Sequence, residues 1–217
     1  MKKKQFAVIG MGRFGSSVAR TLYQMGYDVM AIDLDEEIID ELKDEVTYGI
    51  TADAQEERVL ESLGVRNFDV VIVAIGNDIE ASILITLTLK ELGVKKVVAK
   101  AINERHGRVL EKVGADKIVY PERDMGERVA HYLVSANLLD YIEISDKYSL
   151  SEVTVPSFLV QKSLKQINLR VKYGVNVIAI KRGDKLIVAP PGEEVLNHDD
   201  VLICIGLTQD LDRFASM

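Results

Sequence analysis

The stretch Phe6–Gly15, FAVIGMGRFG, decides the fold of this 217-residue chain. A short apolar strand pattern, Phe6–Ile9, runs directly into Gly10-x-Gly12-x-x-Gly15, and an amphipathic helix pattern follows. Gly10 permits a tight turn, Gly12 lets the backbone approach a phosphate, and Gly15 lets the helix pack closely on the strand. Free backbone N–H groups at the start of that helix then face the phosphates. Strand, turn and helix together predict a dinucleotide-binding turn.

Two charged residues extend this pattern. Asp33 ends a second apolar run and lies roughly 20 residues past the turn, where a carboxylate accepts hydrogen bonds from ribose hydroxyls and repels a 2′-phosphate. Arg13 begins the helix, where a cation is unfavourable unless it binds an anion such as phosphate. We therefore predict adenine-nucleotide binding. The alternative is a Rossmann-like domain whose site holds no ligand.

Strand and helix patterns alternate up to Tyr120, and continuous apolar strands such as Val70–Ala74 fit a parallel sheet buried on both faces. The alternation predicts an α/β fold, a Rossmann-type doubly wound parallel sheet with its ligand at the carboxyl edge. Strands are expected at Gln5–Ile9, Asp28–Asp33, Val46–Thr51, Val70–Ile75, Lys96–Ala101 and Lys117–Tyr120. Helices are expected at Arg13–Met25, Glu36–Asp44, Gln55–Leu63, Asp78–Leu92 and Asn103–Val113.

The pattern changes after a long amphipathic helix, Arg123–Asn137. Short apolar runs separated by turn signals then predict a small α+β domain with about five strands. We expect two domains: residues 1–137, which bind the nucleotide and include the crossover helix, and residues 138–217. Strands are expected at Tyr141–Ile144, Leu150–Val155, Asn176–Ile180, Lys185–Val188 and Asp200–Ile205, and short helices at Ser163–Ile167 and Thr208–Arg213.

Further candidate site residues follow the strand ends at the carboxyl edge of the first sheet. Asp53 and Ala54 are placed to line the adenine, Lys100 to neutralise phosphate or bond the base, and Glu122 to hold a cation beside the phosphates. Each of them alone is more often a helix cap or a loop residue. The full set of predicted binding residues is Gly10, Met11, Gly12, Arg13, Phe14, Gly15, Asp33, Leu34, Asp35, Asp53, Ala54, Ala74, Ile75, Gly76, Lys100 and Glu122.

Composition and charge exclude several partners. The net charge is −7 and no basic cluster occurs beyond the N-terminal lysines, so no nucleic-acid partner is expected. The single cysteine, Cys204, excludes an internal disulfide and a cysteine-rich zinc site. We see no signal peptide and no apolar stretch long enough to span a bilayer, so we expect a cytosolic protein that reaches a membrane only through a partner.

No catalytic residues are expected. The sequence has no Ser-His-Asp, HExxH or CxxC arrangement and no acid or base placed beside a nicotinamide. The glycine turn and Asp33 taken alone still fit an NAD(H)-dependent oxidoreductase or an NAD(H) sensor. A structural scaffold that binds nucleotide only for stability is a further alternative.

The chain resembles one protein family along essentially its whole length. The segments that carry the resemblance are, in order, FAVIGMGRFGSSVARTL, AIDLDEE, ITADAQEERVLESLGVRNFDVVIVAIGND, EASILITLTLKELGV, VVAKAINERHGRVLEKVGADKIVYPERDM and NLRVKYGVNVIAIKRGDKLIVAPP. They are similar to the cytosolic regulatory subunits of Ktr-type bacterial potassium uptake systems, close to the Trk regulatory proteins. The resemblance implies an N-terminal and a small C-terminal RCK domain, and a regulatory subunit without turnover of its own.

The resemblance also implies an assembly and its ligands. The assembly is a homodimer that forms a homo-octameric ring on the cytoplasmic face of a membrane potassium-translocating subunit. ATP or ADP binds at the glycine turn, NAD(H) binds in some relatives, and Arg13 reaches phosphate. Asp33 and Asp35 serve the ribose, and Lys100 serves the base region. Glu122 matches an acid that binds a divalent or monovalent cation between subunits.

A second ligand follows from the same resemblance. In many Gram-positive members the C-terminal domain binds cyclic di-AMP at its dimer interface. Arg170, Asn176 and Pro190 match the positions that bind it. Asn168 departs from the family pattern, because relatives often carry Asp there.

Overall fold

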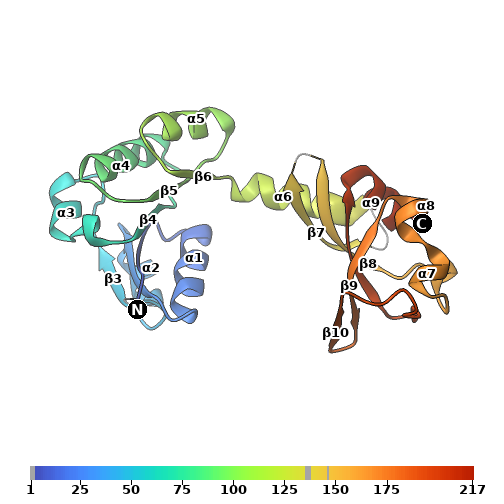
Figure 1. Ribbon diagram of the computed structural model, residues 1–217. Helices are drawn as coiled ribbons and strands as arrows, with labels where there is room; N and C mark the ends of the chain where they lie inside the picture. The colour runs from blue at the N-terminus through green and yellow to red at the C-terminus, as the bar shows by residue number, and fades with distance from the viewer. Residues whose placement is uncertain (1–2, 135–137, 146) are drawn as a thin grey trace. The chain divides into compact units, whose positions relative to one another are not determined.

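The chain forms two compact units in the computed structural model, Met1–Glu122 and Arg123–Met217 (Figure 1). The structure describes residues 3–134, 138–145 and 147–217. Helix α6 (Pro121–Val134) begins where the two units meet in the sequence. The predicted domain boundary at residues 137 and 138 touches positions outside the described residues, so the assignment of α6 to the first domain stays a prediction.

The first unit is built on a parallel sheet. Its strands are β1 (Gln5–Ile9), β2 (Asp28–Asp33), β3 (Tyr48–Thr51), β4 (Val70–Val73), β5 (Val97–Lys100) and β6 (Lys117–Val119). Its helices are α1 (Arg13–Gln24), α2 (Glu36–Leu42), α3 (Glu57–Ser62), α4 (Ile79–Glu91) and α5 (Glu104–Lys112). The strand order is β3-β2-β1-β4-β5-β6, and every neighbouring pair is parallel. This confirms the predicted doubly wound fold: β2 and β3 extend the sheet on one side of β1, and β4, β5 and β6 extend it on the other.

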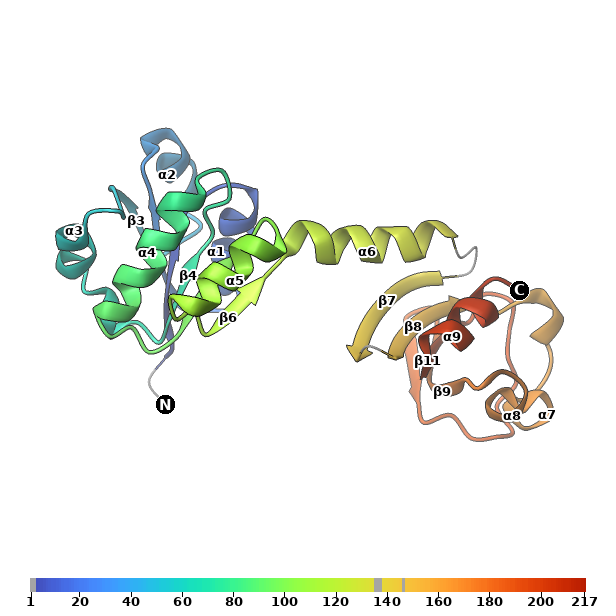
Figure 2. The ribbon, with the colours of Figure 1, turned by 90° about the horizontal axis from the view of Figure 1, so that it is seen from above.

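Helices cover both faces of this sheet. Along β1, Ala7 and Ile9 belong to one buried cluster with residues of α3, α4 and α5, whereas Val8 belongs to another with residues of α1 and α2. Helices α4 and α5 run side by side on the first of these faces (Figure 2). Burial on both faces explains why the strands read as continuous apolar runs instead of alternating ones.

The second unit holds an antiparallel sheet, which confirms the predicted small α+β domain. Its strands are β7 (Leu138–Ser145), β8 (Tyr148–Thr154), β9 (Asn176–Arg182), β10 (Lys185–Val188) and β11 (Val201–Leu207), and its helices are α7 (Leu164–Ile167), α8 (Leu169–Tyr173) and α9 (Thr208–Ala215). The strand order is β10-β9-β11-β8-β7. Leu211 and Phe214 of α9 are buried with Leu202 of β11 in one core.

Several element boundaries differ from the predictions. The helix predicted to end at Leu63 ends at Ser62, because Gly64 takes a left-handed conformation (φ +65°) and starts a separate 3₁₀ turn, Val65–Asn67. Helix α8 was not predicted; Asn168, also left-handed (φ +50°), separates it from α7. The helix predicted over Arg123–Asn137 already begins at Pro121, and its last three positions lie outside the described residues. No helix in the described ranges has the length and apolarity needed to cross a membrane.

Candidate nucleotide-binding site

A cleft of about 630 Å³ lies at the carboxyl ends of β1, β2, β3, β4 and β5. This is the edge of a doubly wound sheet where ligands bind, and the volume is that of a small-molecule site. The predicted binding residues that line it are Gly10, Gly12, Arg13, Phe14, Asp33, Leu34, Asp53, Ala54, Ala74, Ile75, Gly76, Lys100 and Glu122.

The glycine turn has the geometry of a phosphate cradle. Gly10 is left-handed (φ +93°), and a Cβ at Gly15 would come within 1.9 Å of the Gly10 carbonyl oxygen, so the turn needs both glycines. A Cβ at Gly12 would meet no atom of the chain within 4 Å. Gly12 therefore leaves open space in the cleft beside the start of α1, whose first turn carries no acid. Open space beside unpaired helix N–H groups suits a phosphate.

Asp33 is fixed in place by the backbone around it. Its carboxylate accepts hydrogen bonds from the Met11 N–H and, at 3.0 Å, from the Asp35 N–H. A carboxylate has about four acceptor positions, so capacity remains for ribose hydroxyls. The structure thus holds the acid against the glycine turn with its orientation already set.

Three predicted residues do not line the cleft. The Met11 side chain is 2% exposed and packs in the core with α1. Gly15 serves the packing of α1 on the turn. The Asp35 carboxylate caps α2 by accepting from the Glu37 and Ile38 N–H groups. Helix capping was the alternative role considered for acids in these loops, and Asp35 has that role.

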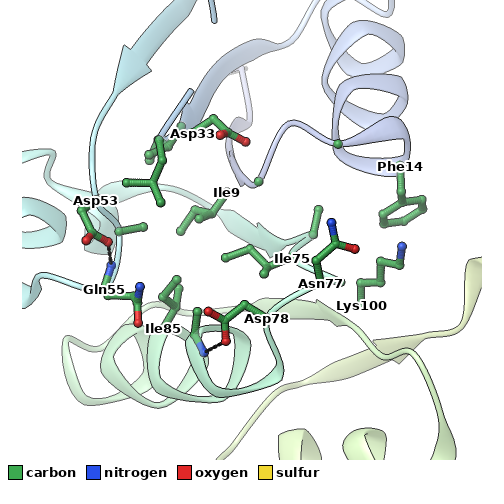
Figure 3. Close-up of a pocket in the computed structure, with 18 of the residues that line it drawn as sticks. Ile9, Phe14, Asp33, Asp53, Gln55, Ile75, Asn77, Asp78, Ile85 and Lys100 are labelled. Atoms are coloured by element: carbon green, nitrogen blue, oxygen red, sulfur yellow. Dashed lines mark hydrogen bonds between the residues drawn. The ribbon is translucent and has the colours of Figure 1, made fainter. Parts of the chain in front are cut away.

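The cleft has two ends, which Figure 3 shows in close-up. Asp33 and Asp53 lie at one end, and Phe14, Asn77 and Lys100 lie at the other. The Asp53 carboxylate accepts a hydrogen bond from the Gln55 N–H at 2.9 Å. Lys100, which the family resemblance places in the base region, is therefore remote from the predicted adenine residue Asp53.

Lys100 forms an ion pair with Glu122. The Lys100 Nζ donates to Glu122 Oε1 at 2.6 Å and lies 5.9 Å from the centre of the Phe14 ring. The lysine side chain is 11% exposed, whereas that of Glu122 is 69% exposed. The hydrogen bond from Lys100 holds the pKa of the Glu122 carboxyl below its ordinary value. The Glu122 carboxyl is therefore ionised in the neutral pH range.

Among the residues that the structure describes, Glu122 is part of no preformed metal centre. Within the part of the chain that the structure describes, no group of three or more His, Cys, Asp or Glu side chains is arranged to hold a metal ion. A cation at Glu122 would need further oxygen ligands, such as those of a bound phosphate.

Other lining residues were absent from the predicted set. They are Ile9, Ile32, Ala52, Gln55, Asn77, Asp78, Ala81 and Ile85. Asp78 caps α4 through the Ala81 N–H, and Ala81 and Ile85 stand one turn apart on that helix. The sequence does carry a signal for this apolar side of the cleft. Ala81 and Ile85 are spaced four residues apart after the capping residue Asp78, so they lie on one face of the helix.

The three residues matched to a cyclic di-AMP site lie in the second unit. Arg170 is exposed on α8, Asn176 is exposed at the start of β9, and Pro190 is half-buried just after β10. They stand outside the lining of a cavity of about 480 Å³ in the same unit, which involves Phe158, Lys162 and neighbouring residues.

The chain is similar to known domain families and known proteins along nearly its whole length. The TrkA-N domain model matches residues 6–121, and the TrkA-C domain model matches residues 150–217. The Ktr system potassium uptake protein C of Bacillus subtilis (strain 168) is 50% identical over 212 residues, covering 98% of this chain and 96% of that protein. The Ktr system potassium uptake protein A of the same organism is 45% identical over 214 residues, covering 99% and 96%.

The fold is also that of a solved structure, the GsuK channel bound to NAD. It aligns with 100% of this chain and 40% of its own, with a TM-score of 0.68 and 18% identity. At that identity the likeness concerns the fold. Family models and full-length relatives lead to one conclusion: the chain belongs to the family of Ktr potassium uptake proteins, built from a TrkA-N and a TrkA-C domain.

Proposed function

We propose that this protein is the cytosolic regulatory subunit of a potassium transporter, and that it binds ATP or ADP in the cleft of its first unit. The observation that carries the proposal is the glycine turn, which is open at Gly12 and faces a cleft that Asp33 also lines. The 50% identity to a potassium uptake protein over 98% of the chain supports potassium transport as the process it serves.

The residues of the cleft suit the parts of an adenine nucleotide. Asp33 is oriented to accept hydrogen bonds from ribose hydroxyls, and Asp53 lies at the same end, on the adenine side. The N–H groups at the start of α1 and the Arg13 guanidinium are suited to the phosphates. Glu122 would hold a divalent or monovalent cation together with phosphate oxygens.

Binding without turnover fits the chemistry of the cleft. The Asp33 and Asp53 carboxylates accept backbone hydrogen bonds, and the Glu122 carboxylate is paired with Lys100. These contacts fix and orient the acids instead of leaving one as a general base for a substrate. We therefore infer a sensor and not an enzyme.

The nucleotide acts by shifting a conformational equilibrium. A ligand moves such an equilibrium only as far as its affinities for the two states differ. ATP and ADP differ by one phosphate, so contacts at Arg13 and Glu122 are the ones that can distinguish them. We propose that a homodimer, assembled into an octameric ring on the inner face of the membrane, transmits this difference to a potassium-translocating partner.

The second unit is proposed to bind cyclic di-AMP at an interface between two copies of the chain. The support is the matching of Arg170, Asn176 and Pro190 to family positions. Arg170 and Asn176 are exposed and thus accessible to a ligand.

Calorimetric binding of ATP, ADP, NAD and NADH to the purified protein tests the nucleotide proposal. Arg13→Ala is expected to weaken ATP binding about tenfold, because a charge-assisted phosphate contact is lost. Arg108→Ala, an exposed arginine on α5, is the matched control and should bind like the wild type. A preference for NADH that ignores Arg13 would instead favour an NAD(H) sensor or an oxidoreductase.

A further inference from the structure

We propose that Lys100 is the residue that senses phosphate and that Glu122 restrains it. Before ligand binds, Glu122 holds the ammonium group as an internal counter-ion. When a nucleotide is present, Lys100 leaves Glu122 and donates to a phosphate oxygen, and the released carboxylate is free to bind a cation. This inference rests on the proposed nucleotide site and assigns Lys100 to the phosphates instead of the base.

The unequal burial of the two partners is the first support. The Lys100 side chain is 11% exposed and has lost most of its water, whereas Glu122 is 69% exposed. An ammonium group has three N–H donors, and within the described residues Lys100 has one hydrogen-bond partner, Glu122 Oε1. A largely dehydrated cation with donors to spare is strongly attracted to an anion that enters the cleft.

The position of the ammonium group is the second support. A Cβ at Gly76 would lie 3.2 Å from Lys100 Nζ, so the ammonium rests directly above that glycine. The preceding residue, Ile75, contacts Gly10, since a Cβ at Gly10 would lie 2.9 Å from its Cγ1 atom. Lys100 therefore contacts Gly76, whose neighbour Ile75 contacts Gly10 of the phosphate cradle. Figure 3 shows its ammonium group directed toward Phe14, which belongs to the first turn of α1.

Lys100 and a metal cation compete for the Glu122 carboxylate, and this competition couples cation binding to nucleotide binding. The carboxylate cannot pair fully with both Lys100 and a metal cation, because the two positive charges would repel each other across it. Nucleotide phosphate and cation therefore favour each other's binding, and linkage makes this effect reciprocal. In the absence of cation, Glu122 opposes nucleotide binding by retaining Lys100.

ATP affinity measured by calorimetry in EDTA tests this competition. Glu122→Gln is expected to tighten cation-free ATP binding about tenfold, because a neutral amide holds an ammonium less strongly than a carboxylate. An unchanged cation-free affinity in Glu122→Gln would overturn the inference. Thermal unfolding of each variant verifies that it is folded, which is expected because Glu122 is mostly exposed.

A double-mutant cycle separates this pair from a general effect of charge. In the Lys100→Met background, Glu122→Gln should no longer tighten ATP binding, because the restrained residue is gone. In the Lys96→Met background, which removes an exposed lysine just before β5, the full gain should remain. A gain that persists in Lys100→Met would refute a role for the pair. Failure of the wild type to bind ATP at all would instead refute the proposed function.

Discussion

Gly12→Ala should separate folding from nucleotide binding. The backbone of Gly12 (φ −62°, ψ −177°) is one that alanine adopts without strain, and the new methyl group meets no atom within 4 Å. Alanine at a helix N-cap costs about 1 kcal/mol relative to glycine. Alanine also lowers the conformational entropy of the unfolded chain, which stabilises the folded protein by about 0.4–1 kcal/mol. The two effects nearly cancel, so the stability of the ligand-free protein should change by less than about 1 kcal/mol.

Nucleotide binding should respond quite differently. The methyl group fills the space that a phosphate needs in order to approach the backbone. Losing one charge-assisted hydrogen bond costs about 1.5–3 kcal/mol, which weakens ATP binding roughly 10- to 150-fold. Calorimetry with ATP, beside thermal unfolding of the ligand-free protein, measures both quantities in one preparation.

Gly15→Ala is the contrasting control. Its methyl group would lie 1.9 Å from the Gly10 carbonyl oxygen, so the first unit should unfold at markedly lower temperature. If Gly12→Ala binds ATP as tightly as the wild type, or if it destabilises the protein as much as Gly15→Ala, the phosphate cradle is wrongly located.

Two further predictions concern buried charge and pH. Arg182→Met should destabilise the second unit by about 3 kcal/mol, measured by denaturant unfolding. The reason is that the Asp200 side chain is 1% exposed and accepts two hydrogen bonds from the Arg182 guanidinium. A loss of stability below about 1 kcal/mol would contradict this role. Burial lowers the pKa of His106 in the folded protein, so the unfolded state takes up the proton first and stability should decline as pH falls below about 6.5. His106→Gln should reduce the fall in Tm between about pH 7.5 and pH 5.5, whereas exposed His198→Gln should not; equal slopes in both variants would argue against it.

The sequence predicted those parts of the site that depend on local geometry and on strand order. The glycine turn is a local structure, and the end of β2 that carries Asp33 pairs alongside β1 in a parallel sheet, so both could be located without coordinates. The cleft that they line, with Asp53 and Gly76 from the neighbouring strand ends, follows from the same rule.

The remaining features depend on contacts that no local pattern specifies. The pairing of Lys100 with Glu122 requires α6 to begin at Pro121, two residues before the predicted start, and requires the lysine to fold over Gly76. The hydrogen bond from the Met11 N–H to Asp33 depends on the left-handed conformation of Gly10. Such contacts depend on tertiary packing, which cannot be predicted from residue spacing and composition.

Potassium flux in vesicles that contain the membrane-embedded potassium-translocating partner is the most direct test of nucleotide-controlled gating. With wild-type protein bound to the vesicles, we expect flux in ATP to differ from flux in ADP. Gly12→Ala at the same protein concentration should abolish the difference. Equal flux in ATP, in ADP and without nucleotide, from wild-type protein that binds both nucleotides, would contradict regulation and leave a scaffold that binds nucleotide for stability.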